Sequence, residues 1–411
     1  MYNLVIFFYS LAVRLATFFN RKADLMIDGQ KQTFDLLKQK IDPKKKYIWF
    51  HAASLGEFEQ GRPLIEKIKK QRPRTKILLT FFSPSGYEVR KNYPQADVIC
   101  YLPFDTHKNV QQFLELVPLE MAIFIKYEFW KNYLDALKQR NIPTYIISAF
   151  FTPRQMFFKW YGATYRNILS NYTELFVQDA NSKELLVANG INRVIVSGDT
   201  RFDRVHEIFQ QKKQLPLIEK MLHVSRHQKD IALVAGSTWG KDEDLIIPYF
   251  NQNPDMKLII APHEIGAERI QQIIDQLDRP YLRYSELTET NAGTADCVII
   301  DCFGLLSSIY RYGEIAYIGG GFGHGIHNVL EAAVYAIPVL WGPKYYAFRE
   351  AENLILDGGG ESITGAEAFT NRMDALLLMP EWRKEMGKKA GQFIAKNLGA
   401  TNTIYSKIFT V

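Results

Sequence analysis

The stretch YGEIAYIGGGFGHGIHNVLEAAVYAIPVLWGP, from Tyr312 to Pro343, is the part of the sequence that decides the fold. An apolar run from Glu314 to Ile318 predicts a strand, and the five glycines within 319–325 predict a loop. A helix is expected from about Asn328 to Ala336, followed by a second buried strand. Glycines let the backbone approach a ligand, and the first N–H groups of a helix are unpaired and partly positive. The stretch therefore predicts a phosphate site in a βαβ unit, with a glycine-rich loop that binds nothing as the alternative.

The same pattern of apolar runs and helical segments repeats along the chain in two series. Each run is continuous, which is typical of strands covered on both faces in a parallel sheet. The first series comprises the runs at 47–53, 76–82, 97–103, 121–126, 143–151, 175–178 and 193–198. The second comprises the runs at 231–236, 257–262, 297–301, 314–319 and 337–342. Two such series predict an α/β protein of two doubly wound, Rossmann-like domains that face a central cleft, with ligands outside the carboxyl ends of the strands.

The domain boundaries are taken from these two series. We expect a membrane-associated segment at 1–22, a first Rossmann-like domain at 23–200 and a polar linker at 201–230. The second Rossmann-like domain is expected at 231–380. The last segment, 381–411, is expected to be helical and could cross back to the first domain.

Apolar and aromatic residues dominate the N-terminus from Leu4 to Asn20, apart from Arg14. The run is shorter than the roughly 20 residues that a membrane-spanning helix needs, and two basic residues follow it. It has neither the basic region nor the cleavage site of a signal peptide. We expect an interfacial helix or a short anchor, with a buried helix as the alternative. A second stretch, 151–172, mixes aromatic residues with Arg154 and other cations, which suits an anionic membrane surface or a buried aromatic helix.

Composition and charge exclude several classes of function. A net charge of +6 on 411 residues is mildly basic, which is compatible with anionic substrates or membranes and does not indicate a nucleic-acid partner. The three cysteines have no metal-binding spacing, so a reduced cytoplasmic setting is the simplest interpretation. The DED sequence at 242–244 lies near a helix start, where acidic residues are favoured anyway. We expect no metal and no other cofactor.

Candidate residues in the first half follow the predicted strands. Ser54 and Gly56 form a turn after the first strand, and Glu57 sits at the start of a helix. There Glu57 could take a proton from an acceptor hydroxyl, or it could merely complement the positive helix end. Ser83 opens SPSGYE, either an anion-binding loop or a plain helix cap. Glu128 follows the fourth strand at the edge of the predicted cleft, where it could bind acceptor hydroxyls or cap a helix.

Candidate residues for an anionic ligand come from the second half and the linker. Arg201 could bind a phosphate or carboxylate with two parallel hydrogen bonds. Gly236 and Ser237 belong to a turn that is expected to open a helix, and His263 ends the next strand. Glu331, inside the helix after the glycine loop, could hold a ribose diol or be an ordinary helix acid.

The order of the motifs SLGE, SPSGYE, LPFD, KYEFW, GDTRFD, GST, APHE and GIHNVLEAA…PVLWGP resembles the Kdo transferases. These enzymes move 3-deoxy-D-manno-octulosonic acid (Kdo) from CMP-Kdo onto the lipid A precursor of bacterial lipopolysaccharide. The resemblance runs from the N-terminal segment to about Asn353, and the last loop by itself is a general mark of two-Rossmann (GT-B) glycosyltransferases. It implies a GT-B fold, direct transfer with inversion, no metal, and a place on the cytoplasmic face of the inner membrane.

The resemblance also implies roles for individual residues. Glu57 would be the general base, and CMP-Kdo would contact Arg201, Gly236, Ser237, His263, Gly325, Asn328 and Glu331. Acceptor contacts are expected from Ser54, Gly56, Ser83, Glu128 and Arg154. The chain departs from the family where Arg201 replaces Lys, where Pro262 precedes His263 in place of Arg, and where Ile326 replaces Gly. We expect Ile326 to reshape the pocket slightly, and the cationic partner of the Kdo carboxylate is not identified.

Two other functions are compatible with the pattern. Another GT-B enzyme, such as a lipid-linked N-acetylglucosamine transferase or a UDP-sugar 2-epimerase, would release UDP instead of CMP, and an epimerase would lack the apolar N-terminus. A catalytically silent, membrane-bound scaffold is the third hypothesis, against which Glu57 argues.

Overall fold

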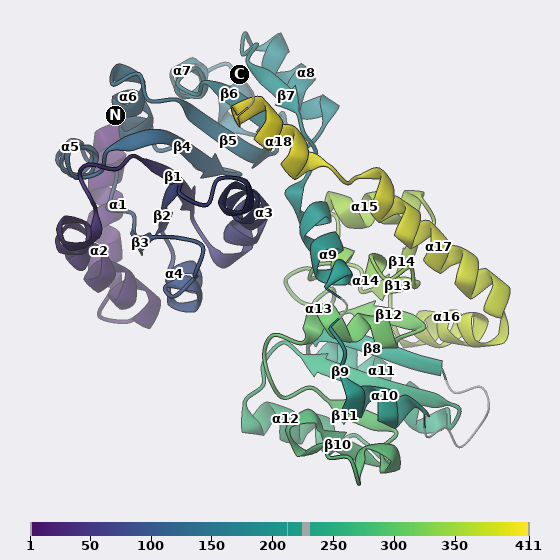
Figure 1. Cartoon of the computed structure of the whole chain (residues 1–411). Coiled ribbons are helices and arrows are strands. Elements are labelled where there is room, and N and C mark those ends of the chain that lie inside the picture. Colours follow the sequence, from purple (N-terminus) through teal and green to yellow (C-terminus); the bar gives the residue numbers. More distant parts are fainter. Residues whose placement is uncertain (1, 212, 224–230, 410–411) are drawn as a thin grey trace. The chain divides into compact units, whose positions relative to one another are not determined.

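The computed structural model describes residues 2–211, 213–223 and 231–409, and it divides into two compact units. Unit 1 comprises Met1–Arg204 and Leu398–Val411, and unit 2 comprises Val205–Asn397 (Figure 1). The predicted linker 201–230 contains most of helix α9 (Thr200–Gln210) and all of helix α10 (Pro216–His223). Residues 212 and 224–230 of the linker lie outside the described residues.

Unit 1 is built on a parallel sheet with the strand order β3-β2-β1-β4-β5-β6-β7. The order reverses between β1 and β4, and in open α/β sheets ligands bind outside the carboxyl ends of the strands at such a switch point. The strands are β1 (Tyr47–Ala52), β2 (Lys76–Phe81), β3 (Val98–Tyr101), β4 (Leu119–Ile125), β5 (Thr144–Ala149), β6 (Glu174–Val177) and β7 (Val194–Val196).

Helices cover both faces of this sheet. Side chains of α2, α5, α6, α7 and α8 pack on one face around Phe113 and Tyr133, and those of α3 and α18 pack on the other around Phe58 and Ile404. The last helix of the chain therefore completes the core of the unit that contains its first residues (Figure 1). The helices are α1 (Tyr2–Ala16), α2 (Arg21–Lys40), α3 (Leu55–Gln71), α4 (Pro84–Arg90), α5 (His107–Leu116), α6 (Lys131–Gln139), η1 (Met156–Phe158), α7 (Ala163–Leu169), α8 (Ala180–Ala188) and α18 (Ala400–Phe409).

Unit 2 has a second parallel sheet, with the order β10-β11-β9-β8-β12-β13-β14 and a switch point between β8 and β12. Its strands are β8 (Ile231–Thr238), β9 (Met256–Pro262), β10 (Tyr281–Arg283), β11 (Cys297–Ile299), β12 (Ile315–Ile318), β13 (Val339–Trp341) and β14 (Gly360–Ser362). The edge strands β10 and β14 are missing from the sequence-based prediction. Each is three residues long and mostly not fully buried, so neither leaves a continuous apolar run.

The helices of unit 2 pack mainly through α11, α12, α16 and α17, which share one apolar core with the sheet. The helices are α10 (Pro216–His223), α11 (Gly240–Gln252), α12 (Ala267–Ile274), η2 (Tyr284–Glu286), η3 (Ala292–Thr294), α13 (Leu306–Ile309), η4 (Tyr310–Tyr312), α14 (Leu330–Ala333), α15 (Arg349–Leu356), α16 (Ala366–Leu378) and α17 (Pro380–Lys396).

The glycine-rich stretch forms two strands as predicted, but the helix between them is a single turn, Leu330–Ala333. The prediction of a helix over 328–336 is therefore wrong. Ala336 adopts a left-handed conformation with φ +56°, and Pro338 follows, so the helix cannot continue. A one-turn helix has almost no macrodipole, and the N-terminus of a long helix is absent from this loop.

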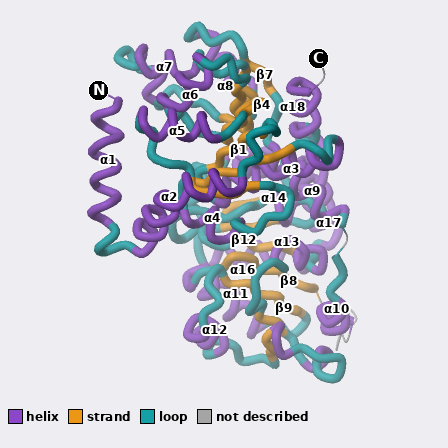
Figure 2. The backbone as a smooth tube through the Cα atoms, turned by 60° about the vertical axis from the view of Figure 1, so that its left-hand side comes forward, coloured by secondary structure: helices purple, strands orange, loops and turns teal. Residues whose placement is uncertain are grey.

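Helix α1 lies at the edge of unit 1 (Figure 2), and most of its large apolar side chains are exposed. Its first turn is attached by the Tyr2 hydroxyl, which donates to Asp105 Oδ2 at 2.6 Å. Ile6 is its one buried residue, whereas Phe7 and Phe8 are more than half exposed, so the alternative of a buried helix is wrong. No single described helix is long and apolar enough to cross a membrane. Helices α1 and α2 meet that length and composition only as a pair, bent by 117°.

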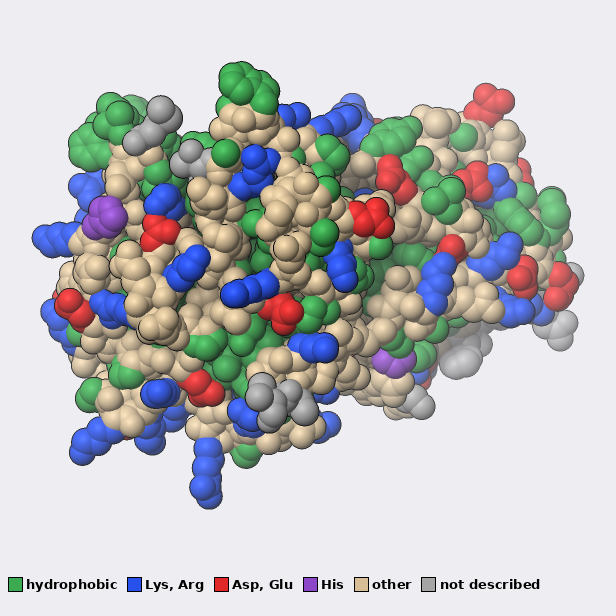
Figure 3. All heavy atoms as spheres, turned by 90° about the horizontal axis from the view of Figure 1, so that it is seen from above, with side chains coloured by type: hydrophobic (Ala, Val, Ile, Leu, Met, Phe, Trp, Pro, Cys, Tyr) green, Lys and Arg blue, Asp and Glu red, His purple; other side chains and the backbone are tan. Residues whose placement is uncertain are grey.

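The side chains of the aromatic stretch 151–172 divide between the core and the surface of unit 1. Phe151 and Phe157 belong to the core of unit 1, whereas Trp160 is 92% exposed and Arg154 is also exposed. Neither predicted alternative describes the whole stretch. On the face shown in Figure 3, hydrophobic side chains lie interspersed with many Lys and Arg side chains.

The packing of α18 generates a stability prediction. Ile404 is fully buried between α3 and the sheet of unit 1, so I404A should destabilise that unit by about 2–5 kcal/mol. Amide hydrogen exchange, resolved by segment, should then accelerate in β1 and β2 more than in β8 and β9. The exposed neighbour Ser406 provides the control variant S406A, which should change neither unit. Faster exchange in unit 2 alone would contradict the assignment of α18 to unit 1.

Candidate functional site

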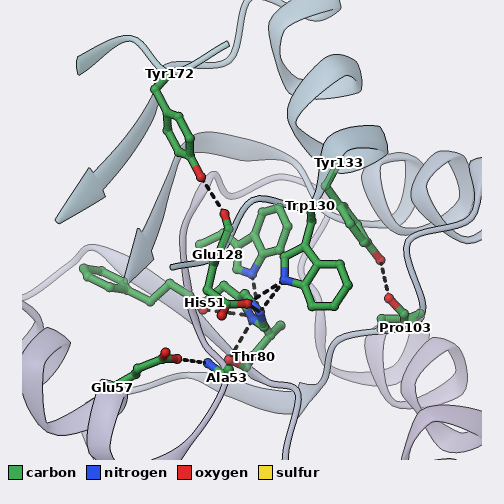
Figure 4. Close-up of polar contacts among 11 residues, drawn as sticks. His51, Ala53, Glu57, Thr80, Pro103, Glu128, Trp130, Tyr133 and Tyr172 are labelled. Atoms are coloured by element: carbon green, nitrogen blue, oxygen red, sulfur yellow. Dashed lines mark hydrogen bonds and ion pairs between the residues drawn. The ribbon is translucent and has the colours of Figure 1, made fainter. Parts of the chain in front are cut away.

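The carboxyl ends of β1 and β4 bring charged side chains together in unit 1. Glu57 is the third residue of α3, and its Oε2 accepts a hydrogen bond from the Ala53 backbone N–H at 2.6 Å (Figure 4). The carboxylate is thus turned back toward the end of β1. Lys126 and Glu128 follow β4, the strand paired with β1 at the switch point.

Glu128 is buried and carries two side-chain hydrogen bonds on one oxygen. Its Oε2 accepts from His51 Nε2 at 2.9 Å and from Trp130 Nε1 at 2.5 Å (Figure 4). The Tyr172 hydroxyl donates to the Glu128 backbone oxygen at 2.5 Å. Helix α6 begins at Lys131 with Trp130 as its N-cap, so the prediction that Glu128 caps a helix is wrong. Only 6% of Glu128 is exposed.

The second nitrogen of His51 contacts Thr80. Nδ1 lies 2.8 Å from Thr80 Oγ1, which accepts from Trp49 Nε1 at 2.7 Å, and 3.2 Å from the Thr80 backbone oxygen. The imidazole is thus held at both ring nitrogens, Nδ1 by Thr80 and Nε2 by Glu128 and Trp130. The sequence did not predict that His51 and Glu128 form a pair, because 77 residues separate them.

The surroundings of Glu57 make it a base near neutral pH. The pKa of Glu57 is raised to about 7. Burial is the largest cause of this rise, and the negative charge of Glu128 is the second. The Ala53 N–H and the positive charge of Lys126 act in the opposite direction. A carboxyl group half ionised near pH 7 is suited to general base catalysis, and a residue that only complements a helix end needs no such pKa.

The other predicted acceptor residues lie in two places. Ser54 is the N-cap of α3 and Gly56 is its second residue, so the prediction that Gly56 forms a turn before the helix is wrong. A Cβ on Gly56 would meet nothing within 4 Å, so packing does not require the glycine. Ser83 caps α4 as the plain interpretation predicted, and its N–H donates to Ala53 O at 2.7 Å, next to the start of α3. Arg154 lies on the loop between β5 and η1.

The structure divides the predicted donor-binding residues between the two units. Arg201 belongs to unit 1, where its Nε and Nη2 donate to Asp199 Oδ2 at 2.9 and 2.7 Å. The remaining residues belong to unit 2.

Gly236 and Ser237 lie inside strand β8, which continues to Thr238 before α11 begins at Gly240. The prediction that they form a turn opening a helix is therefore wrong. Strand pairing decides this, because Gly236 pairs with Ala261 on one side and Ile318 on the other. The two central strands end close together, and the Gly319 N–H donates to Gly236 O at 2.9 Å.

Asp242 holds the start of the glycine loop, a role that sequence reasoning missed. Its Oδ2 accepts from the N–H groups of Trp239 and Gly320, each at 2.9 Å, and its Oδ1 accepts from the Tyr317 hydroxyl at 3.0 Å. An acidic residue three positions after a helix cap was the available signal for the first of these bonds. Nothing in the sequence indicated the bond to Gly320, 78 residues away.

Three rings stack beside the same loop. The ring centroids of Trp239 and His263 lie 4.7 Å apart, and those of His263 and His327 lie 4.6 Å apart. Burial and the charge of His263 lower the pKa of His327 to about 4, so His327 is neutral at physiological pH and accepts from Trp239 Nε1 at 3.3 Å. Across the part of the chain that the structure describes, no group of three or more His, Cys, Asp or Glu residues could hold a metal ion.

Gly325, Asn328 and Glu331 lie together on the loop and turn after β12. Glu331 accepts from Asn328 Nδ2 at 3.3 Å and from the Ser307 hydroxyl at 2.9 Å. Gly325 has φ +130°, and a Cβ there would lie 2.8 Å from the Phe348 ring. Ile326 is buried and so contributes to the core under the loop.

Comparisons with known proteins agree with this geometry. Residues 29–204 match the family model for 3-deoxy-D-manno-octulosonic-acid transferase (kdotransferase). The chain is 26% identical over 373 residues to the 3-deoxy-D-manno-octulosonic acid transferase of Haemophilus influenzae, covering 87% of this chain and 85% of that protein. It is also 26% identical over 348 residues to the protein of the same name from Aquifex aeolicus, covering 83% and 88%.

A solved structure supports the architecture. The UDP-GlcNAc 2-epimerase from Neisseria meningitidis superposes with a TM-score of 0.62 at 15% identity, over 89% of this chain and 100% of that chain. Two doubly wound α/β domains of this kind form the GT-B fold that the sequence predicted.

The charge of Glu128 provides a titration test. In E128Q the negative charge is lost, so the pKa of Glu57 should fall but stay above its ordinary value, because burial remains. Carbon-13 NMR of labelled glutamate carboxyls can follow this titration in the intact protein. The control Y172F removes a hydrogen bond to the Glu128 backbone without changing a charge, so Glu57 should titrate as in the wild type. An unchanged titration in E128Q would contradict the assigned cause.

The close approach of the ends of β8 and β12 leads to a second prediction. A Cβ on Gly319 would lie 2.2 Å from the Ser237 backbone oxygen, so G319A must separate the two strand ends. We expect a loss of about 1–3 kcal/mol in the free energy of unfolding of unit 2, measured by urea denaturation. At Gly266 a Cβ would meet nothing within 4 Å, so G266A is the matched control and should be neutral. If G319A and G266A were equally stable, the strand ends would separate at little cost in free energy, which would contradict the prediction.

Proposed function

We propose that the chain is a Kdo transferase, which moves Kdo from CMP-Kdo to the lipid A precursor in lipopolysaccharide synthesis. The observation that carries the proposal is Glu57. It lies at the switch point of unit 1, within the matched residues 29–204, with a pKa of about 7. No resident cofactor is proposed.

The proposed reaction is a direct displacement with inversion. The Glu57 carboxylate takes the proton of an acceptor hydroxyl, and the hydroxyl oxygen attacks the anomeric carbon of Kdo. As the new glycosidic bond forms, the bond from that carbon to the phosphate oxygen breaks, and CMP leaves with the electron pair. Ser54, Gly56 and Ser83 lie at or near the first turn of α3, which carries Glu57, and are proposed to contact the acceptor. Arg154 is proposed to contribute from its exposed loop.

Donor contacts are proposed for the switch point of unit 2. Gly236 and Ser237 at the end of β8 and Gly325 on the loop after β12 are proposed to contact the donor phosphate, and the ring of His263 adds a stacking surface. Asn328 and Glu331 form a polar pair that could bind hydroxyl groups of the nucleotide. Arg201, although paired with Asp199, remains the proposed cationic contact from unit 1.

Membrane association is proposed through the outward apolar face of α1. Phe7 and Phe8 are exposed there, and Phe19 is exposed in the turn that follows the helix. A water-exposed apolar helix of this kind is suited to the lipid interface on the cytoplasmic side. A lipid-linked acceptor would be met at the same surface.

The first experiment is an assay of Kdo transfer from CMP-Kdo to the lipid A precursor in the presence of EDTA. We expect product and release of CMP from the wild type, and a rate lower by about 10²–10⁴-fold in E57Q, because the general base is removed. The matched control is E120Q, on an exposed residue at the other end of β4, which should retain full activity.

Several outcomes would contradict the proposal. Release of UDP from a UDP-sugar would favour the alternative GT-B enzymes, and an active E57Q would remove Glu57 from the mechanism. A requirement for a divalent cation would overturn the metal-free reaction.

A further inference from the structure

Lys126 occupies the first position after β4, at the same switch point as Glu57. Its φ is +67°, in the left-handed region that residues other than glycine rarely adopt. The Lys126 N–H donates to Ile147 O at 2.9 Å, and the next N–H, of Tyr127, donates to Ile125 O at 3.0 Å. Two backbone hydrogen bonds therefore hold an unfavourable conformation, and such strain is concentrated at functional sites.

The ammonium group of Lys126 has no anionic partner within residues 2–211, 213–223 and 231–409. It lies 5.2 Å from the centroid of the Tyr127 ring, and the side chain is half-buried. Nearby cations differ in this respect, because Lys131 pairs with Asp135 and Arg201 pairs with Asp199. Partly buried charges are normally paired, so Lys126 is held ready for an anion that the described protein does not supply.

The carboxylates around Lys126 are already committed to other donors. Glu57 accepts from the Ala53 N–H, and Glu128 accepts from His51 and Trp130. Lys126 is near enough to Glu57 to lower its pKa, but the two do not form an ion pair. Full pairing with Lys126 would weaken Glu57 as a base, so the arrangement leaves the ammonium for a ligand.

We propose that Lys126 binds an oxyanion of a substrate beside Glu57, either a phosphate of the acceptor lipid or the carboxylate of the transferred sugar. This inference rests on the proposed function and supplies the cationic partner that the sequence did not reveal. It has a consequence for catalysis. An oxyanion compensates the charge of Lys126, so the pKa of Glu57 rises and the base becomes stronger when substrate is bound.

The test compares K126M, which keeps the length of the side chain without its charge, with K126R and with the paired control K131M. KM is measured separately for CMP-Kdo and for the acceptor. A charge-assisted hydrogen bond is worth enough for K126M to raise the KM of one substrate by about 10- to 100-fold. K126R should recover part of this loss, and K131M should match the wild type.

A dephosphorylated acceptor distinguishes the two possible sources of the oxyanion. If a dephosphorylated acceptor removes the difference between wild type and K126M, the ligand group is the acceptor phosphate. If the difference persists and concerns the KM of CMP-Kdo, the group is the sugar carboxylate. Unchanged KM values for both substrates, with only a shifted pH dependence of kcat/KM, would overturn the proposal, because Lys126 would then act only on Glu57.

A binding measurement keeps the inference independent of turnover. Calorimetric titration of the full chain with inorganic phosphate, and separately with free Kdo, should give at least about tenfold tighter binding of one probe to the wild type than to K126M. Equal binding of both probes by the two proteins would overturn it. A wild type that binds a probe through Lys126 but transfers no Kdo would instead refute the proposed function.

Discussion

The N-terminal site depends on one buried negative charge, that of Glu128. A carboxylate removed from water must be hydrogen-bonded, and breaking such a buried pair typically costs about 3–5 kcal/mol. His51 and Trp130 supply those bonds, and Thr80 fixes His51 through its other nitrogen. The same charge, together with burial, keeps Glu57 partly protonated near neutral pH. The hydrogen bonds that stabilise the charged carboxylate of Glu128 thus preserve the charge that raises the pKa of Glu57.

The switch point of unit 2 meets a different requirement with similar topology. Its central strands approach so closely that Gly319 tolerates no Cβ, and Asp242 ties the glycine loop to the start of α11. The glycine loop is thus fixed at a buried strand end next to a stack of rings, with no buried carboxylate comparable to Glu57 among the residues proposed as ligands. The two units therefore differ at their switch points, with a carboxyl group of raised pKa in unit 1 and a packed glycine loop in unit 2.

The apolar N-terminal helix and the acidic site are joined by packed aromatic rings. Tyr9 of α1 stacks on Phe82 with centroids 6.2 Å apart, and Phe82 contacts Trp130 at 4.8 Å. Trp130 in turn donates to Glu128. The proposed lipid-linked acceptor would need both an apolar surface and a base for its hydroxyl, and this row of rings connects the two within one unit.

The sequence by itself determined the strands, the GT-B architecture and the position of Glu57 at a strand end. Continuous apolar runs report burial on both faces, and the order of short motifs is specific to a family. The environment of Glu57 was decided only by tertiary structure, because His51 and Glu128 are 77 residues apart. The same holds for the bond from Asp242 to Gly320, the return of α18 to unit 1 and the strained backbone of Lys126. Local patterns reflect local conformational preference, whereas the charge state of a buried group depends on whatever distant residues the fold places around it.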